Sequence, residues 1–167
     1  MELALNISKP YQVSIYDISK LEDMCKIKFN ILEKILLVNN GTTEQILKVL
    51  LNTSTKLKII RQNESKNILR RESQIITSDG SNNVLILADS KIYLKRIPTK
   101  VIAELRLGRE GIGMIILKHK IETYKKIIKI GYNLEKDSIF RIYRISYKYK
   151  NICEINEKFV GKFDKLT

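Results

Sequence analysis

Two charged residues stand where strand alternation predicts a buried side chain. In residues 69–75 (LRRESQI) the alternation places Arg71 on the more apolar face, and in residues 153–159 (CEINEKF) it places Glu157 there. The same faces carry Leu69, Ser73 and Ile75 in the first stretch and Cys153, Ile155 and Phe159 in the second. Because an unpaired buried charge costs about 3–5 kcal/mol, each of the two needs a partner or a ligand.

Three interpretations of this pair follow from the residues alone. The two side chains could form a buried salt bridge with each other, or a shift of strand register could leave both exposed. In the functional interpretation, Arg71 binds a substrate carboxylate through two hydrogen bonds and Glu157 handles a proton. Glu154 is the alternative carboxylate if the last strand is shifted.

A glycine-rich segment, residues 108–113 (GREGIG), is the third candidate element. Glycines let backbone amides approach an anion closely, and a helix beginning near Ile112 would add the positive end of its dipole. The segment lacks the Gly-Lys-Ser/Thr ending of a nucleotide-phosphate loop. By itself the segment is weak evidence for an anion site, and a plain turn is the favoured alternative.

Composition limits the function classes. The 167 residues carry a net charge of +13, with lysines spread along the whole chain, so we expect an anionic small molecule as partner. One histidine and two cysteines are too few for a structural zinc site, which needs about four ligands, and we expect no metal. No apolar run of about 18 residues and no secretory signal at the N-terminus occur, so we expect a cytoplasmic protein without a membrane partner.

The periodicity predicts one α+β domain over residues 1–167, built on a single antiparallel sheet of about six strands with helices packed against it. The expected helices are 19–38, one that begins at Thr42 with a Thr42/Gln45 capping box, and one from Pro98 to Gly108. The expected strands are 56–62, 67–77, 84–93, 124–132, 139–149 and 152–160. Periodicity also allows a helix at 124–132.

The order of these elements resembles the chorismate pyruvate-lyase family. The likeness rests on residues 69–72 (LRRE), a turn-rich hairpin and a strand that leads into Pro98. It continues with residues 107–113 (LGREGIG), similar to the family's Leu-Gly-Lys-x-Pro-Leu-Gly, and with residues 157–159 (EKF). It covers about residues 30–160 and is closer to the archaeal and mycobacterial branch than to the proteobacterial one.

The resemblance implies conversion of chorismate to 4-hydroxybenzoate and pyruvate in a buried cavity beneath the helices, without cofactor or metal. It assigns Arg71 to carboxylate binding and Glu157 to the active-site glutamate. Ile112, with Gly113 beside it, would pack on the substrate ring, and Thr42 falls where the proteobacterial branch has a ring-contacting methionine. Arg109 is the candidate for the second carboxylate.

Two departures from the family pattern bear on this assignment. Gly111 replaces the proline of the motif, which loosens the loop, and Thr42 replaces an apolar contact.

Two other functions remain open. Effector-binding domains of GntR-type regulators share the implied fold and would bind a ligand without turning it over, although we expect no helix-turn-helix here. A basic protein could also bind nucleic acid, with an affinity that falls steeply with salt.

Overall fold

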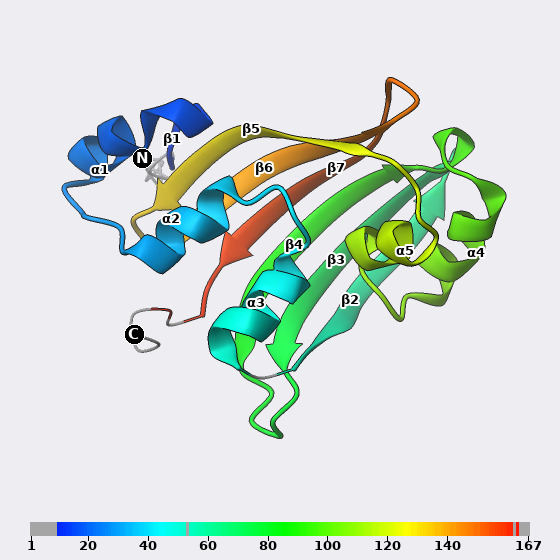
Figure 1. The fold of residues 1–167 in the computed structure, drawn as a ribbon, viewed down its shortest axis with the longest axis horizontal. Helices are drawn as coiled ribbons and strands as arrows, with labels where there is room; N and C mark the ends of the chain where they lie inside the picture. Colours follow the sequence, from blue (N-terminus) through cyan, green and yellow to red (C-terminus); the bar gives the residue numbers. More distant parts are fainter. Residues whose placement is uncertain (1–9, 53, 162, 164–167) are drawn as a thin grey trace, which may run out of the picture.

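The computed structural model describes residues 10–52, 54–161 and 163, and in it one seven-stranded antiparallel sheet forms the body of the molecule (Figure 1). The strands follow the order β1-β5-β6-β7-β4-β3-β2 across the sheet. Their bounds are β1 Tyr11–Val13, β2 Thr55–Ser65, β3 Ile68–Thr77, β4 Val84–Tyr93, β5 Tyr124–Asn133, β6 Ser138–Tyr147 and β7 Lys150–Phe159.

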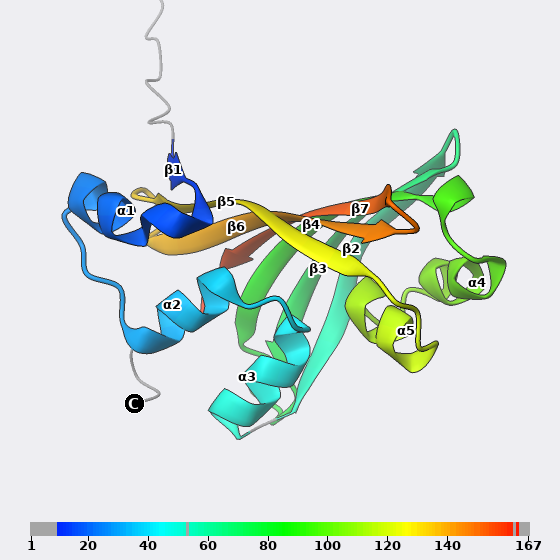
Figure 2. The same cartoon turned by 45° about the horizontal axis from the view of Figure 1, so that its top comes forward.

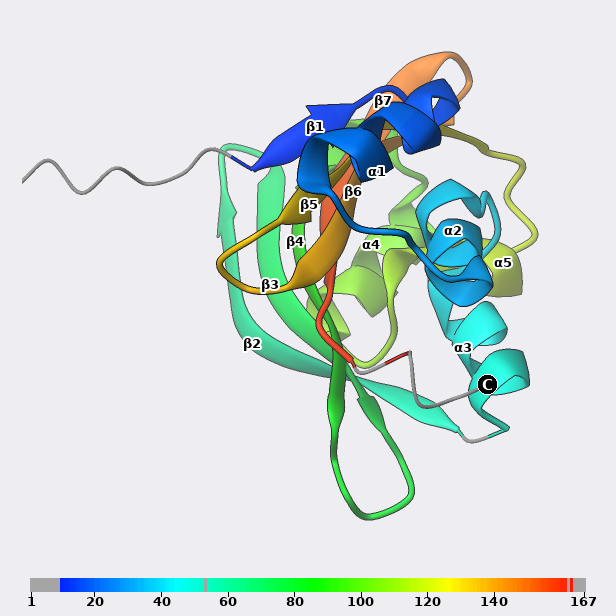
Figure 3. The same cartoon turned by 90° about the vertical axis from the view of Figure 1, so that its left-hand side faces the viewer.

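The α-helices of the described residues are α1 Ile18–Cys25, α2 Ile31–Val38, α3 Thr43–Leu51, α4 Thr99–Leu107 and α5 Ile112–Lys118. Two short 3-10 helices also occur, Ile15–Asp17 before α1 and Leu94–Arg96 between β4 and α4. Figures 2 and 3 show α2, α3, α4 and α5 on the same side of the curved sheet. The predicted α+β class with one antiparallel sheet is therefore confirmed. The seventh strand was missed because the three residues of β1 are too few to show alternation.

The single helix predicted for residues 19–38 is wrong, since two helices occupy this stretch. Lys26 ends α1 in the left-handed conformation, with φ of 56°. Asn30 then begins α2 with a capping box, in which its side chain accepts from the Glu33 amide and the Glu33 carboxylate accepts from the Asn30 amide. The buried Glu22 carboxylate accepts the Phe29 amide at 2.8 Å and so fixes the connection.

The other local predictions hold with one exception. The hairpin β3–β4 forms, β5 is a strand, and α4 follows Pro98 and ends at Gly108 with φ of 65°. Thr42 is the N-cap residue of α3, but its side chain makes no capping hydrogen bond. The capping box predicted for Thr42 and Gln45 is therefore absent.

Three small residues leave open space in the middle of the sheet's inner face. Ser73 on β3 pairs with Ala88 on β4, and Arg71 pairs with Ser90 on β4. Across the next strand, Ala88 pairs with Glu157 on β7. Large apolar side chains fill both ends of this face, so the small residues mark where the helices do not meet the sheet.

None of the helices in the described residues has both the length and the apolar character that a membrane crossing requires. The N-terminal stretch on which the expected localisation rests, residues 1–6, lies outside the described residues.

Candidate functional site

A cavity of about 840 Å³ lies between the inner face of the sheet and helices α3 and α5. Five of the six residues predicted for the site line it: Thr42, Arg71, Ile112, Gly113 and Glu157. Arg109, the sixth, does not line the cavity and its side chain is exposed. The structure therefore does not bring Arg109 together with the other five, and a contact between Arg109 and a ligand stays a prediction.

Arg71 is a buried cation fixed by neutral acceptors. Its side chain is 4% exposed. Its Nε donates to the Gln62 side chain at 2.8 Å, Nη1 donates to the Glu110 carbonyl at 3.2 Å, and Nη2 donates to the Leu105 carbonyl. The Leu105 carbonyl belongs to the last turn of α4, where a cation is favoured by the helix dipole. These bonds hold the guanidinium at the cavity wall.

No carboxylate forms an ion pair with Arg71 among residues 10–52, 54–161 and 163. Burial lowers the pKa of Arg71 from its ordinary value, because the charged form has lost contact with water. A guanidinium has five N–H groups. Three are used here, so one hydrogen on each terminal nitrogen is available for a ligand.

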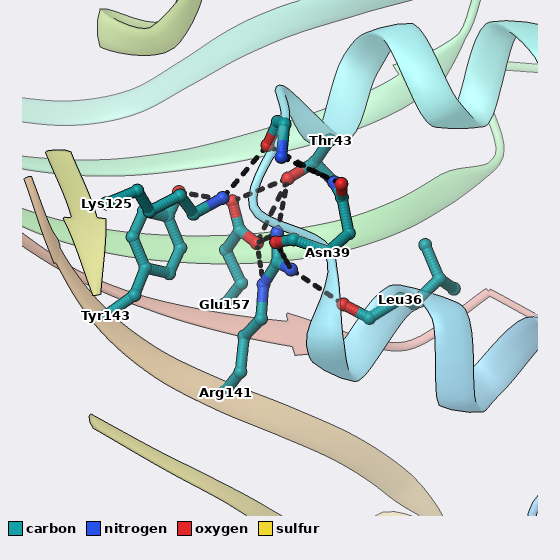
Figure 4. Close-up of polar contacts among 8 residues, drawn as sticks. Leu36, Asn39, Thr43, Lys125, Arg141, Tyr143 and Glu157 are labelled. Atoms are coloured by element: carbon teal, nitrogen blue, oxygen red, sulfur yellow. Dashed lines mark hydrogen bonds and ion pairs between the residues drawn. The ribbon is translucent and has the colours of Figure 1, made fainter. Parts of the chain in front are cut away.

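Glu157 has a different partner from the one considered above. Arg141 on β6 lies directly opposite Glu157 on β7, and its Nε and Nη2 are both 2.8 Å from Glu157 Oε2. The Tyr143 hydroxyl donates to Oε1 at 2.8 Å, and the Thr43 hydroxyl contacts both oxygens at 3.1 and 3.2 Å. Figure 4 shows these three side chains converging on the carboxylate.

Arg141 also ties the helices to the sheet. The side chain is fully buried, and its Nη1 donates to the Leu36 and Asn39 carbonyls at the end of α2, at 2.7 and 2.8 Å. Its Nη2 donates to the Thr43 hydroxyl at the start of α3. One arginine thus ties both the end of α2 and the start of α3 to the sheet.

Arg71 and Glu157 share the inner face without touching. Arg71 is aligned through Ser90 with Ile155, two residues before Glu157 on β7. Two strand spacings and two residues along the strand place their Cα atoms about 12 Å apart. Both the Arg71–Glu157 salt bridge and the register slip that would expose the two residues are therefore wrong. Glu154, the alternative carboxylate, pairs with Arg144 on the outer face.

The network keeps Glu157 ionised. Burial alone raises the pKa of Glu157, but the charges of Arg141 and Lys125 and the hydrogen bonds from Tyr143 and Arg141 outweigh it, so the pKa lies below its ordinary value. A carboxylate has about four lone-pair positions, and three hydrogens from Arg141, Tyr143 and Thr43 fill most of them. Glu157 can therefore accept one more hydrogen bond but is a weak base.

Among the further ionisable groups that line the cavity, Glu44 at the start of α3 and Lys125 on β5 are half-buried, whereas Lys120, Glu122 and Tyr124 are exposed. Burial, followed by the negative charges of Glu157 and Glu110, raises the pKa of Glu44 to about 7. Burial, followed by the charge of Arg141, lowers the pKa of Lys125 to about 7. Lys125 Nζ donates to the Gly41 carbonyl at 3.0 Å and lies 4.0 Å from the Tyr143 ring centre.

We expect Glu44→Gln to stabilise the protein at pH 8 and not at pH 4. The folded-state pKa of about 7 exceeds the ordinary 4.5, so wild-type stability falls as pH rises from about 4.5 to 7, when Glu44 must ionise. The glutamine variant avoids this loss. At pH 8 its free energy of unfolding should therefore exceed that of wild type by on the order of 2 kcal/mol. Urea unfolding at both pH values measures it, with Glu154→Gln as control. An equal effect of Glu44→Gln at both pH values would contradict the account.

The remaining predicted residues form the apolar side of the site. Ile112 is buried at the first turn of α5. A Cβ added at Gly113 would lie 3.3 Å from the Thr42 methyl carbon, so glycine permits α3 and α5 to approach. The Thr42 hydroxyl oxygen is buried without a hydrogen-bond partner, which leaves it open to a ligand.

Sequence reasoning missed Arg141, Tyr143, Glu44 and Lys125. Arg141 and Tyr143 alternate with Ile139 and Ile145, all of them buried, but the opposite face of β6 also carries the apolar Phe140 and Ile142. The inner face could not be chosen from this pattern. Glu44 resembles any acidic residue in a first helical turn, and Lys125 lies in the stretch that also allowed a helix.

The described residues contain no cluster of three or more histidine, cysteine or carboxylate side chains placed to hold a metal ion. In the same part of the chain, three cationic side chains line the cavity, of which Arg71 is buried, Lys125 is half-buried and Lys120 is exposed.

No protein-family model matches the chain. The fold and the site define an α+β protein with a charged cavity on the inner face of an antiparallel sheet, and the chain belongs to the family of a protein named as a lyase. That protein is "Putative lyase MJ0807" of Methanocaldococcus jannaschii, which is 32% identical to the chain over 155 residues. The alignment covers 81% of this chain and 82% of the relative.

Proposed function

We propose that the protein is a lyase that converts chorismate to 4-hydroxybenzoate and pyruvate. The observation that carries the proposal is Arg71, a buried cation without a carboxylate partner in the described residues, on the wall of the cavity that also contains Glu157. A buried charge of this kind favours an anionic ligand. The lyase name of the relative and the resemblance of three motifs support the reaction type.

The cavity offers a binding group for each part of chorismate. The ring carboxylate binds the two free N–H groups of Arg71, and the ring hydroxyl occupies the remaining acceptor position of Glu157. The ring itself spans the small residues of β3 and β4 and packs against Ile112. The enolpyruvyl carboxylate, attached beside the ring hydroxyl, meets Lys125, which lies close enough to Glu157 to affect its pKa. Lys125 thus takes the role first expected of Arg109.

The reaction is an elimination that needs no redox step. The C4–H bond and the C3–O bond of chorismate break, the C–H electron pair forms the C3=C4 bond, and the ring becomes aromatic. The C–O electron pair leaves with the enolpyruvate oxygen, which receives a proton and yields pyruvate. Because aromatisation supplies driving force, the enzyme contributes orientation and stabilisation of the negative charge on the leaving group.

Purified protein mixed with chorismate is expected to form 4-hydroxybenzoate and pyruvate in equal amounts, above the rate without protein. Chromatography measures the first product and a lactate dehydrogenase assay the second. The matched control is Arg70→Ala, since Arg70 lies next to Arg71 in sequence but points to the outer face. Chorismate binding without product would indicate a ligand-binding domain in place of an enzyme. Neither binding nor product would reject chorismate.

A further inference from the structure

We propose that Glu44 is the catalytic proton carrier of this site, taking the proton from ring carbon C4 and delivering it to the departing enolpyruvate. The inference rests on the proposed function and deepens it. Glu44 lines the same cavity as Glu157 and is close enough for the charge of Glu157 to raise its pKa, so we place its carboxyl group near the position proposed for the ring hydroxyl. The hydroxyl and the departing hydrogen share carbon C4, so the base must lie near the group that binds the hydroxyl.

The Glu44 carboxyl group is free to act. It lines the cavity, and no hydrogen bond to it occurs within the part of the chain that the structure describes. Glu157, in contrast, already accepts from three donors, its one remaining acceptor position is assigned to the ring hydroxyl, and its pKa lies below its ordinary value. A general base needs a lone pair that is not already occupied, and Glu44 has it.

The neighbouring loop is shaped around this carboxylate. A Cβ added at Gly111 would lie 3.3 Å from Glu44 Oε1 and 3.4 Å from Oε2. A larger residue there, such as the proline of the motif that the loop resembles, would press on the carboxylate. Gly111, which appeared only to loosen the loop, therefore makes room for Glu44 in the cavity.

The other ionisable groups of the cavity are less suited. An arginine side chain is not deprotonated in proteins, which excludes Arg71, and burial raises the pKa of Tyr143 well above its ordinary value. Lys125 is already engaged with the Gly41 carbonyl and the Tyr143 ring, and its positive charge is needed for the enolpyruvyl carboxylate. This leaves Glu44.

Glu44 alone can carry out both proton transfers of the reaction. The Glu44 carboxylate takes the C4 proton as the C3–O bond breaks, and the neutral carboxyl group then returns the proton to the enolpyruvate. Its pKa of about 7 suits both directions of transfer near neutral pH. The charged groups that face it are Glu157 from β7, Glu110 from the α4–α5 loop and Lys125 from β5. Below about pH 7 Glu44 is protonated and cannot take the ring proton.

The test compares wild type with Glu44→Gln under single-turnover conditions, with protein in excess over chorismate, so that product release does not set the rate. We expect at least about a hundredfold lower rate for the variant, as for other general bases. We expect its Kd for 4-hydroxybenzoate, measured by calorimetry, to stay within about threefold of wild type. The wild-type rate is expected to fall tenfold per pH unit below about pH 7, and the variant's residual rate to lack this limb.

Glu154→Gln, on the outer face, is the matched control and should retain the wild-type rate and pH profile. If Glu44→Gln does not fold, Glu44→Asp replaces it and should keep the acidic limb at a shifted pH. A Glu44→Gln rate within about threefold of wild type, or an unchanged acidic limb in either variant, would overturn the inference but leave the lyase function intact. Absence of 4-hydroxybenzoate with wild type would overturn both. A matching loss in Lys125→Gln alone would identify Lys125 as the base instead.

Discussion

Arg141→Met is expected to lower the free energy of unfolding by about 3–5 kcal/mol, because it leaves the Glu157 carboxylate buried without its counter-ion. The same change removes the donor to the Leu36 and Asn39 carbonyls and so frees the end of α2 from the sheet. Urea unfolding at pH 7 measures the loss, which is large relative to the 5–15 kcal/mol typical of a domain.

The chain contains a matched control for this prediction. Arg144, on the same strand, pairs with Glu154 at 2.8 Å, but both side chains are exposed. Arg144→Met should therefore cost no more than about 1 kcal/mol. In a Glu157→Gln background, Arg141→Met should cost at least about 1 kcal/mol less than in wild type, since no charge is left unpaired. Similar costs for Arg141→Met and Arg144→Met would contradict the buried network.

Arg71→Ala is expected to reduce kcat/KM for chorismate by about thirtyfold to several thousandfold, because a buried carboxylate–arginine contact is worth about 2–5 kcal/mol. Arg71→Lys should recover only part of this, since an ammonium group cannot donate to both carboxylate oxygens in the planar geometry of a guanidinium. Initial rates of 4-hydroxybenzoate formation over a range of chorismate concentrations measure both variants.

The comparison for this prediction is Arg70→Ala, which removes an arginine from the outer face of the same strand. Far-UV circular dichroism should show that all three variants are folded. If turnover in Arg71→Ala stayed within about threefold of that in Arg70→Ala, Arg71 would not be the residue that binds the carboxylate. Another cation of the cavity would then have to bind it.

Strand alternation was sufficient to place Arg71 and Glu157 on the inner face. In both strands the residues that share their face are mostly apolar, and the residues of the opposite face are mostly polar. Gly108 and Pro98 marked the ends of α4 for equally local reasons, a left-handed backbone and a fixed φ. These features depend on a few neighbouring residues, so they can be predicted from the sequence.

The partners of the two charges could not be predicted in this way. Arg141 and Glu157 pair because β6 and β7 are neighbours in register, and β6 is apolar on both faces, so its inner side was ambiguous. Arg109 was expected in the cavity because it lies in the glycine loop, but its side chain is exposed and is not among the lining residues. The raised pKa of Glu44 comes from burial in the cavity and then from the charges of Glu157 and Glu110, all of which depend on residues distant in sequence.

A crystal structure with 4-hydroxybenzoate tests the central claim most directly, since the product retains the ring, the carboxylate and the hydroxyl. We predict the carboxylate at the terminal nitrogens of Arg71 and the hydroxyl at Glu157, with the ring against Ile112. A product molecule that binds outside the cavity, or one whose carboxylate is held by other residues while Arg71 keeps only its three present contacts, would contradict it.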